Sequence, residues 1–503
     1  MRLASVCGLG LLLVAGLVQA DAPFGKVVEE SWDAAYLQGE KIGFFHTTVR
    51  AFERDGEKIL RTSGELDLTV RRFNQQARLR AETGTEETPD GKVTGVFMTN
   101  YLDKGQKLEM NGRIVNGQVL LTMNGGRQER KNPWDDRVIG MYRQQRLFAE
   151  KKVKPGDRFS YQSFEPSIGM VMTVNVSVKQ EEDVATPAGK KRLLRVEASS
   201  DKIKAENGEF QLPGVTMWLD SDLQVVRTEM ELPIGKVVLH RTNKDVAMRP
   251  GGLPSTDVGT APDIKLSKKI PNPHGVRAVV YRITVKGDDE PAKTFAQDER
   301  QQVKDVKGPT FDLRVRAIRQ PPAEDGAQKV GPEFLESSFF ITSDDPEVRR
   351  LTNLAIGKET DPWEKACRIE LWVCRHMNRF NPSVEFTTAA RVARGLEGDC
   401  RQHAILTTAM CRAAGVPART ALGLLYVDKR VGPVMGFHMW TEVWVRGQWL
   451  GIDPVLGRGG IGAAHLKVSD HSWHETQSLT PVLPVMRVVG KLAIEVVEVE
   501  PVK

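Results

Sequence analysis

The first half of the chain is dominated by apolar and polar residues that alternate with a period of two. The alternation is clear over residues 65–71 and again over 173–178, and it is typical of antiparallel strands that bury one face of a sheet. Asn116-Gly117 predicts a two-residue hairpin between two such strands. Asp220-Ser221-Asp222 predicts a further turn. We therefore predict an antiparallel β-rich domain over residues 21–247.

A small β module is predicted after this domain. Residues 248–263 are dense in Pro, Gly, Ser and Thr, which is typical of a linker. Two runs, 276–285 and 311–318, then have the composition of strands, with a charged connection over 286–307 between them. The module, taken as 264–318, is near the lower size limit for an independent hydrophobic core. We expect it to space or present the domain that follows.

In the last third of the chain the spacing of apolar residues changes to three and four, as in amphipathic helices. Asp345-Pro346 and Asp361-Pro362 each place a capping acid before a proline at the first helical position. We predict an α+β domain over residues 333–480, followed by a C-terminal strand segment over 481–503. The whole chain is thus predicted to be a multidomain α+β protein.

The N-terminal residues 1–20 are typical of a signal peptide. Arg2 provides the charged start, residues 9–18 form an apolar run, and cleavage is predicted near Ala20. The run is too short to span a bilayer, and no later stretch approaches the roughly 20 apolar residues that a transmembrane helix needs. We predict an exported protein, periplasmic or secreted, without a transmembrane segment.

The distribution of charge along the chain argues against nucleic-acid binding. The formal net charge is +6, and basic and acidic residues are interspersed without a long run of one sign. Proteins that bind DNA or RNA usually carry a basic patch or stripe. We therefore predict no nucleic-acid partner.

Four cysteines lie beyond the signal peptide, all in the last third of the chain: Cys367, Cys374, Cys400 and Cys411. Cys367 and Cys374 are seven residues apart in a helical pattern, a rise of about 10 Å, whereas a disulfide needs Cα atoms within about 7 Å. A pairing between different helices stays open. We interpret Cys367, Cys374 and Cys411 as buried free thiols.

Cys400 differs from the other three because it is predicted to begin a helix. The helical spacing follows Gly398-Asp399-Cys400 and ends at Gly415-Val416-Pro417. The free amides and the dipole at a helix start favour a thiolate and can hold a developing oxyanion. Cys400 is therefore a candidate nucleophile.

A histidine and an aspartate are predicted to meet on two neighbouring strands. If Arg446-Gly447 forms a two-residue turn, Val445 faces Gln448, and His438 becomes a diagonal neighbour of Asp453 on the same face. A three-residue loop would break this parity. The spacing thus allows the carboxylate to orient the imidazole, as in a cysteine triad.

Three motifs together resemble a known family. Gly-Asp-Cys at a helix start, Phe-His-Met-Trp-Thr-Glu-Val-Trp over 437–444 and Trp-Leu-Gly-Ile-Asp-Pro over 449–454 are similar to the core motifs of the bacterial transglutaminase-like superfamily, within the papain-like cysteine hydrolase fold. The resemblance covers about residues 334–470. It implies that Cys400 is the nucleophile, His438 the general base and acid, and Asp453 the orienting carboxylate.

This sequence departs from the family pattern at two places without losing a catalytic group. Arg401-Gln402 stands where many members have a more acidic pair, and Met439 replaces a common alanine. The side-chain donor to the oxyanion stays open among Trp363, Trp372 and Gln402.

Other histidines were weighed as alternatives. His403 lies one helical turn after Cys400, and neighbours on one helix do not readily point at the same reacting atom. His471, His474 and Glu475 resemble a metal cluster, but their spacing matches no strong zinc motif, and a solvated loop is the better interpretation. We predict no cofactor and no metal.

The leading hypothesis is an exported cysteine-dependent acyl-transfer enzyme that acts on amide or peptide bonds through a thioester. Its expected substrate is a protein or peptide, with cell-wall peptides included, and hydrolysis and amine transfer both stay open. The alternative is a non-catalytic binding or scaffold protein in which the β-rich domain recognises a partner and the last domain is degenerate.

Overall fold

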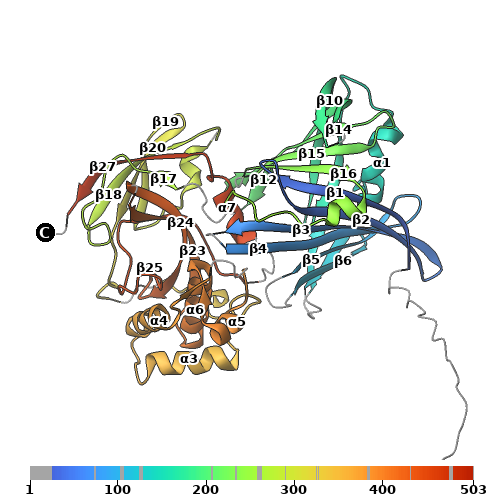
Figure 1. The fold of residues 1–503 in the computed structure, drawn as a ribbon. Coiled ribbons are helices and arrows are strands. Elements are labelled where there is room, and N and C mark those ends of the chain that lie inside the picture. The colour runs from blue at the N-terminus through green and yellow to red at the C-terminus, as the bar shows by residue number, and fades with distance from the viewer. Residues whose placement is uncertain are drawn as a thin grey trace, which may run out of the picture.

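The computed structural model describes residues 25–501 apart from short gaps at 73–74, 102–106, 124–128, 188, 206–207, 233–234, 258–262, 289, 325, 327, 382–385, 431 and 475–479. A large sheet from the first half of the chain lies on the right in Figure 1, and the smaller sheets and most helices lie on the left. The chain is therefore a multidomain α+β protein. The predicted signal peptide, residues 1–20, lies outside the described residues.

The large sheet has 14 antiparallel strands in the order β8-β7-β6-β5-β4-β3-β2-β1-β16-β15-β14-β11-β10-β9. Helix α1 (Met141–Lys151) connects β8 to β9, and α2 (Lys244–Met248) follows β16. The strands are β1 (Lys26–Leu37), β2 (Glu40–Arg54), β3 (Glu57–Arg72), β4 (Gln75–Glu87), β5 (Val93–Tyr101), β6 (Lys107–Val115), β7 (Gln118–Met123), β8 (Glu129–Pro133), β9 (Arg158–Glu165), β10 (Met170–Thr186), β11 (Gly189–Ser200), β14 (Val215–Leu219), β15 (Val225–Leu232) and β16 (Gly235–Thr242). A separate pair is formed by β12 (Ile203–Ala205) and β13 (Gly208–Phe210).

The sheet curls so that its two ends approach each other. One core cluster joins Val96 of β5 and Leu121 of β7 to Phe164 of β9, which lies at the opposite end of the strand order. The predicted hairpin at Asn116-Gly117 is confirmed, because β6 and β7 pair across these two residues and both have positive φ angles. A tight turn of this kind requires positive φ at both positions.

The four-stranded sheet has the order β19-β20-β18-β27 and is built from distant segments. Its strands are β18 (Ala278–Val285), β19 (Gln301–Lys307), β20 (Thr310–Arg316) and β27 (Leu492–Glu500). The C-terminal strand thus completes a sheet that begins more than 200 residues earlier. Strand β19 lies inside the segment predicted as a charged connection. That expectation was wrong because β19 is an edge strand with mostly exposed polar side chains, so it lacks the apolar alternation of a buried strand.

This four-stranded sheet, called the small sheet below, packs into the last domain and does not act as a spacer. One core cluster combines Tyr281 and Phe311 from the small sheet with Leu424, Tyr426 and Leu466 from the sheet of the last domain. These side chains are less than 2% exposed. The apolar face of this four-stranded sheet is thus buried against its neighbour rather than in a core of its own.

The last domain combines a five-stranded sheet with helices, and β23 and β24 lie between the helices and the small sheet in Figure 1. Its strands are β17 (Ile264–Lys265), β23 (Ala418–Lys429), β24 (Gly432–Val445), β25 (Gln448–Ile452) and β26 (His465–His471), and β21 (Arg379–Phe380) pairs with β22 (Glu397–Gly398). Its helices are α3 (Pro346–Ile356), α4 (Pro362–His376), α5 (Ala389–Gly395), α6 (Cys400–Ala413) and α7 (Leu483–Met486). Short 3₁₀ turns span Pro291–Thr294, Pro332–Phe334 and Thr480–Val482.

The predicted helix starts are confirmed. The Asp345 side chain accepts hydrogen bonds from the Glu347 and Val348 amides, and Asp361 accepts one from Glu364. Both helices have proline at the first helical position, where the missing N–H costs nothing. Within the described part of the chain, no helix is both long and apolar enough to cross a bilayer.

Candidate active site

Cys400 is the first residue of α6, and the residues before it form an ordered helix cap. The Asp399 side chain accepts from the Arg401 amide, and the Gln402 side chain accepts from the Asp399 amide, both at 3.0 Å. Gly398 has a φ of 143°, and a Cβ there would lie 2.6 Å from the Gln402 side chain. The motif Gly398-Asp399-Cys400 is therefore needed to begin this helix in this conformation.

The four cysteines described are free thiols, but they differ in environment. Burial raises the pKa of Cys367 to about 12 and raises the pKa of Cys374 and Cys411 as well. Cys411 is fully buried as predicted, whereas Cys367 and Cys374 are only half-buried. Cys400 is also half-buried and thus accessible at a helix start.

His438 and Asp453 are brought together by the hairpin of β24 and β25. Val445 pairs with Gln448 across Arg446-Gly447, as the sequence predicts. Nε2 of His438 lies 2.9 Å from Oδ2 of Asp453. Both side chains are buried, with relative exposures of 8% and 1%. Because Nε2 faces the carboxylate, Nδ1 is the ring nitrogen left for Cys400.

The electrostatics of this pair favour a protonated His438. Burial by itself lowers the pKa of His438, but the charge and hydrogen bond of Asp453, together with a hydrogen bond and charge interaction with Cys400, raise it to about 10. Burial acts to raise the pKa of Asp453, yet the neighbouring histidines hold it far below its ordinary value. The structure thus brings together Cys400, His438 and Asp453, the three predicted site residues.

Two buried residues near Asp453 were missed by the sequence analysis. Oε1 of Glu370 on α4 accepts from the Asp453 amide at 2.9 Å, and Oε2 accepts from the Gly459 amide at 2.7 Å. Nε2 of His465 on β26 lies 2.9 Å from Oδ2 of Asp453. Burial raises the pKa of Glu370 to about 7. A carboxylate inside the apolar stripe of α4 and a histidine inside the apolar run 461–468 were the available signs.

The alternative histidines have other partners. Nδ1 of His403 contacts the Asp399 carbonyl at 2.8 Å and Nε2 contacts the Met377 carbonyl at 3.1 Å. Both ring nitrogens are thus held by backbone, which agrees with the rejection of His403 as the base. His474 pairs with Glu336 at 2.9 Å, and Nδ1 of His471 accepts from the Trp473 amide. Glu475 lies outside the described residues.

The three oxyanion candidates have contacts of other kinds. Gln402 is buried and uses its side-chain oxygen in the helix cap. Trp363 is buried in the core beneath the helices, and Trp372 stacks on His376 with ring centroids 4.1 Å apart. The Cys400 amide, at the start of α6, belongs to the backbone donors that a helix leaves without an intrahelical partner.

His438, Asp453 and His465 are the described group with the composition and spacing of metal ligands. Their candidate ligand atoms lie within 4.8 Å of one another. Both Nε2 atoms are 2.9 Å from the same carboxylate oxygen, whereas zinc needs ligand distances of about 2.0–2.2 Å. A metal would have to displace both hydrogen-bonding protons, so the arrangement fits hydrogen bonding better.

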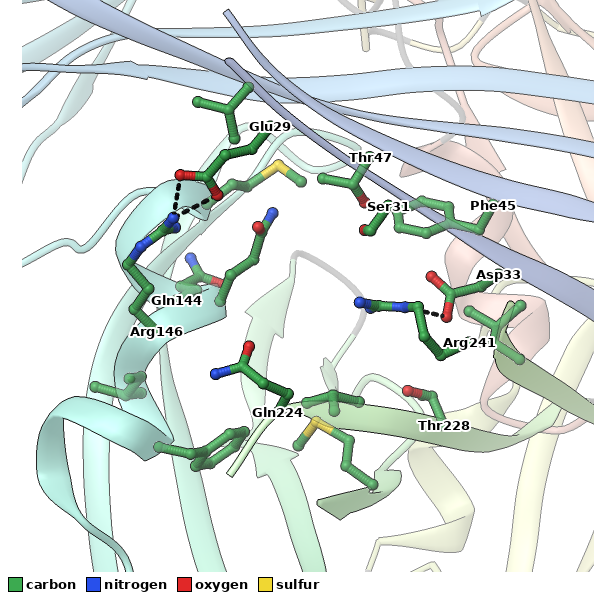
Figure 2. Close-up of a pocket in the computed structure, with 18 of the residues that line it drawn as sticks. Glu29, Ser31, Asp33, Phe45, Thr47, Gln144, Arg146, Gln224, Thr228 and Arg241 are labelled. Carbon is green, nitrogen blue, oxygen red and sulfur yellow. Dashed lines mark hydrogen bonds and ion pairs between the residues drawn. The ribbon is translucent and has the colours of Figure 1, made fainter. Parts of the chain in front are cut away.

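A cavity lies on the large sheet, next to α1 (Figure 2). It has a volume of about 540 Å³. Arg241 pairs with the buried Asp33 at 2.9 Å, and Arg146 pairs with Glu29 at 2.5 Å. The described lining residues include no cysteine and no histidine. The described cysteines thus all lie in the last domain, away from this cavity.

Comparison with known proteins identifies the last domain. A family model described as the transglutaminase-like superfamily matches residues 349–454, which contain Cys400, His438 and Asp453. A search of curated proteins found no match.

Several solved structures show distant similarity. A candidate cysteine protease from Cytophaga hutchinsonii is 17% identical, with 44% of this chain and 82% of that chain covered and a TM-score of 0.28. A β-barrel-like protein of unknown function from Brucella abortus is 12% identical, with 42% and 95% covered and a TM-score of 0.32. The periplasmic domain of TgpA from Pseudomonas aeruginosa is 14% identical, with 36% and 91% covered and a TM-score of 0.22. Through the family match and its motifs, the C-terminal domain of this chain belongs to the transglutaminase-like superfamily.

Proposed function

We propose that the protein is a cysteine-dependent acyl-transfer enzyme that acts on amide or peptide bonds, with Cys400, His438 and Asp453 as its catalytic triad. The observation that carries the proposal is the 2.9 Å contact between His438 and the buried Asp453, beside a half-buried thiol at a helix start. A degenerate domain would be free to lose this geometry. Its presence supports chemistry at Cys400.

In the proposed reaction the Cys400 thiolate attacks the amide carbonyl while His438 carries the proton. The carbonyl oxygen becomes an oxyanion, and we assign the Cys400 amide at the start of α6 as a backbone donor to it. When the tetrahedral intermediate collapses, the C–N bond breaks and His438 gives its proton to the leaving amine. The product is a thioester on Cys400.

The second half of the reaction regenerates the thiol. Water or an amine attacks the thioester, and His438 takes the proton from the attacking group. The C–S bond breaks, and a carboxylic acid or a new amide leaves. Asp453 stays ionised throughout, since its charge holds the His438 proton in both halves.

The proposal includes an exported location and a polypeptide substrate. Residues 1–20 have the composition of a signal peptide, which supports a periplasmic or secreted protein. Proteins and peptides, including cell-wall peptides, provide the amide bonds that a thiolate attacks in such locations. The interspersed surface charges support a partner other than nucleic acid.

The test uses a thiol-directed acylating probe and the Cys400→Ala variant. We expect the wild-type chain to be labelled at Cys400, and the variant to lose the label while keeping its circular dichroism spectrum. Cys374→Ala is the matched control, because Cys374 is also a half-buried free thiol of the same domain. This control should keep the label. Equal labelling of wild type and Cys400→Ala would refute the proposal.

A binding function of the large sheet is the second candidate. The cavity next to α1 supports it, because it has polar and apolar walls and a volume of about 540 Å³, within the usual range of ligand sites. If the last domain fails the labelling test, this cavity becomes the main candidate for function. The two functions are otherwise compatible, since they use different parts of the chain.

A further inference from the structure

Asp453 has a second histidine partner that the proposed reaction does not use. Nε2 of His465 contacts Oδ2 of Asp453, the same oxygen that His438 contacts. The His465 side chain is completely buried. An ionised carboxylate only accepts hydrogen bonds, so Nε2 of His465 carries a proton and donates it.

The two histidines differ in charge. Burial lowers the pKa of His465 to about 4, although the hydrogen bond and charge of Asp453 act in the opposite direction. At neutral pH His465 is therefore a neutral donor beside a protonated His438. The single carboxylate faces one positive charge, and the proton that the reaction needs stays on His438.

The surroundings hold the His465 ring in place. Arg300 donates to the His465 carbonyl at 2.8 Å, and the ring packs edge-on against Trp440 and His274, with centroids 5.3 and 6.1 Å away. The nearby charged or titratable groups are thus Arg300, His274, His438 and Asp453.

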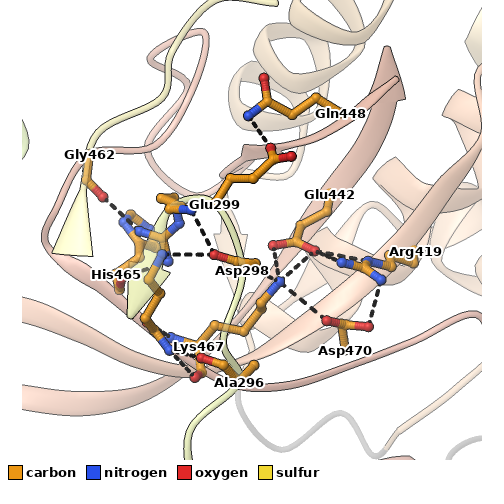
Figure 3. Close-up of polar contacts among 12 residues, drawn as sticks. Ala296, Asp298, Glu299, Arg419, Glu442, Gln448, Gly462, His465, Lys467 and Asp470 are labelled. Carbon is orange, nitrogen blue, oxygen red and sulfur yellow. Dashed lines mark hydrogen bonds and ion pairs between the residues drawn. The ribbon is translucent and has the colours of Figure 1, made fainter. Parts of the chain in front are cut away.

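The strand that carries His465 is anchored two residues later. Lys467 is almost fully buried and pairs with Asp298 at 2.6 Å, Glu442 at 3.0 Å and Asp470 at 3.2 Å (Figure 3). Asp298 and Arg300 precede β19 of the small sheet, so that sheet helps to fix β26. A buried charge network of this kind specifies geometry more than it adds stability.

A histidine at position 465 lowers the stability of the folded protein, so its presence there needs a reason. Nδ1 of His465 is buried and has no hydrogen-bond partner among the described residues. A buried nitrogen without a partner destabilises the folded state, whereas an apolar ring would not. The favourable feature of His465 is therefore its Nε2 donor.

We infer that His465 is a positioning residue of the proposed active site. By donating to Oδ2 it holds the Asp453 carboxylate in the orientation that also receives Nε2 of His438. This keeps Nδ1 of His438 directed at Cys400. Glu370 complements it by holding the Asp453 backbone. The inference rests on the proposed function, because His465 acts only through Asp453 and His438.

The experiment measures how fast iodoacetamide alkylates Cys400 in the full chain, by mass spectrometry of the Cys400 peptide between pH 5 and pH 10. His465→Phe keeps a ring but removes the donor, and His465→Gln keeps an amide donor near the same place. We expect His465→Phe to slow alkylation at pH 7 by about 10- to 100-fold, as the loss of a positioning partner does, and to change the pH profile. His465→Gln should stay close to wild type. Alkylation of Cys374 in the same samples is the internal control.

A second background shows whether His465 acts through Asp453. In Asp453→Asn, the additional change His465→Phe should leave the Cys400 rate unchanged, because the group that His465 positions has lost its charge. A full further loss in this background would overturn the inference, since it would mean that His465 acts by another route.

The outcomes separate the inference from the proposed function. If wild-type Cys400 reacts no faster than Cys374, the proposed function fails and the inference fails with it. If wild-type Cys400 is reactive but His465→Phe has the wild-type rate and pH profile, only the inference fails. Should His465→Phe not fold, an ¹⁵N titration of the wild type decides. The inference requires a proton on Nε2 of His465, and a ring that carries its proton on Nδ1 alone would overturn it.

Discussion

The substitution Asp453→Asn tests the electrostatic basis of the site most directly. It removes the negative charge beside His438 while it keeps the size and shape of the side chain. In the wild type the influence of Asp453 and Cys400 outweighs burial and raises the pKa of His438 to about 10. Without the charge, burial should dominate, and the pKa of His438 should fall below its ordinary value of 6.5.

The free-energy preference of His438 for its protonated form can be calculated in two ways. A rise in pKa from 6.5 to about 10 corresponds to about 5 kcal/mol of preference for the charged imidazole, at about 1.36 kcal/mol per pKa unit. Two unit charges about 4 Å apart, centred on groups in hydrogen-bond contact, attract by about 4 kcal/mol at an effective dielectric constant of about 20. The charge attraction is thus of the same order as the net shift, and the hydrogen bond to Asp453 and the interaction with Cys400 add to it against the opposing effect of burial.

The assay is an ¹⁵N NMR titration of the histidine rings. The chain has nine histidines, and the His438 signal is assigned by its absence in His438→Gln. We expect wild-type His438 to stay protonated from pH 6 to pH 9 and to lose its proton near its pKa of about 10. In Asp453→Asn the ring should be neutral at pH 7. Alkylation of Cys400 at pH 7 should slow accordingly, because the imidazolium partner of the thiolate is lost.

Asp33→Asn is the matched control, since Asp33 is also buried and ion-paired but lies in the large sheet. It should leave the His438 titration unchanged. If His438 loses its proton at the same pH in wild type and in Asp453→Asn, the carboxylate is not the source of the raised pKa, and the electrostatic reasoning is refuted.

The same pair predicts a pH dependence of stability. The folded pKa of His438, about 10, lies above its unfolded value of 6.5, so folding favours the protonated form. The stabilisation is fully present below pH 6.5 and is lost as the pH rises through about 10. The melting temperature of the wild type should fall over this window, and that of Asp453→Asn should fall less.

Two further substitutions test the supports of the site by urea unfolding. Lys467→Met should cost about 3–5 kcal/mol, because it removes the buried cation that pairs with Asp298, Glu442 and Asp470 and leaves only Arg419 beside the last two. The exposed Lys190→Met should cost less than about 1 kcal/mol. Equal effects would contradict a structural role for the buried network. Glu370→Gln should lower the free energy of unfolding by about 1–3 kcal/mol, because an amide offers one acceptor oxygen to N–H groups that now donate to two carboxylate oxygens. Its effect should add to that of Asp33→Asn, since Asp33 lies in the large sheet. Strong coupling between the two effects would contradict this placement.

Local patterns were enough to locate the candidate site. The cap at Asp399 follows from short-range hydrogen bonding, so the start of α6 at Cys400 could be predicted. The pairing of Val445 with Gln448 follows from the parity of a two-residue turn, and it put His438 next to Asp453. The catalytic roles of these residues stay predictions for the experiments above.

Packing between distant parts of the chain decided which further residues and strands join the site and the sheets. His465 reaches Asp453 only because β26 pairs with β23 and because Arg300 from the small sheet holds its carbonyl. Glu370 belongs to the site only because α4 packs against the chain after β25. The same holds for β27, whose partner β18 lies more than 200 residues away.

The sequence by itself therefore determined most element types, although not the edge strand β19, together with the helix caps, the hairpin register and the identity of the three candidate residues. The tertiary structure decided which further groups surround Asp453, how the small sheet shares its core with the last domain, and where a cavity forms on the curled large sheet. The physical reason is the distance along the chain over which each kind of interaction acts. Caps and turns depend on hydrogen bonds within a few residues, whereas buried polar networks form only when distant strands have already packed.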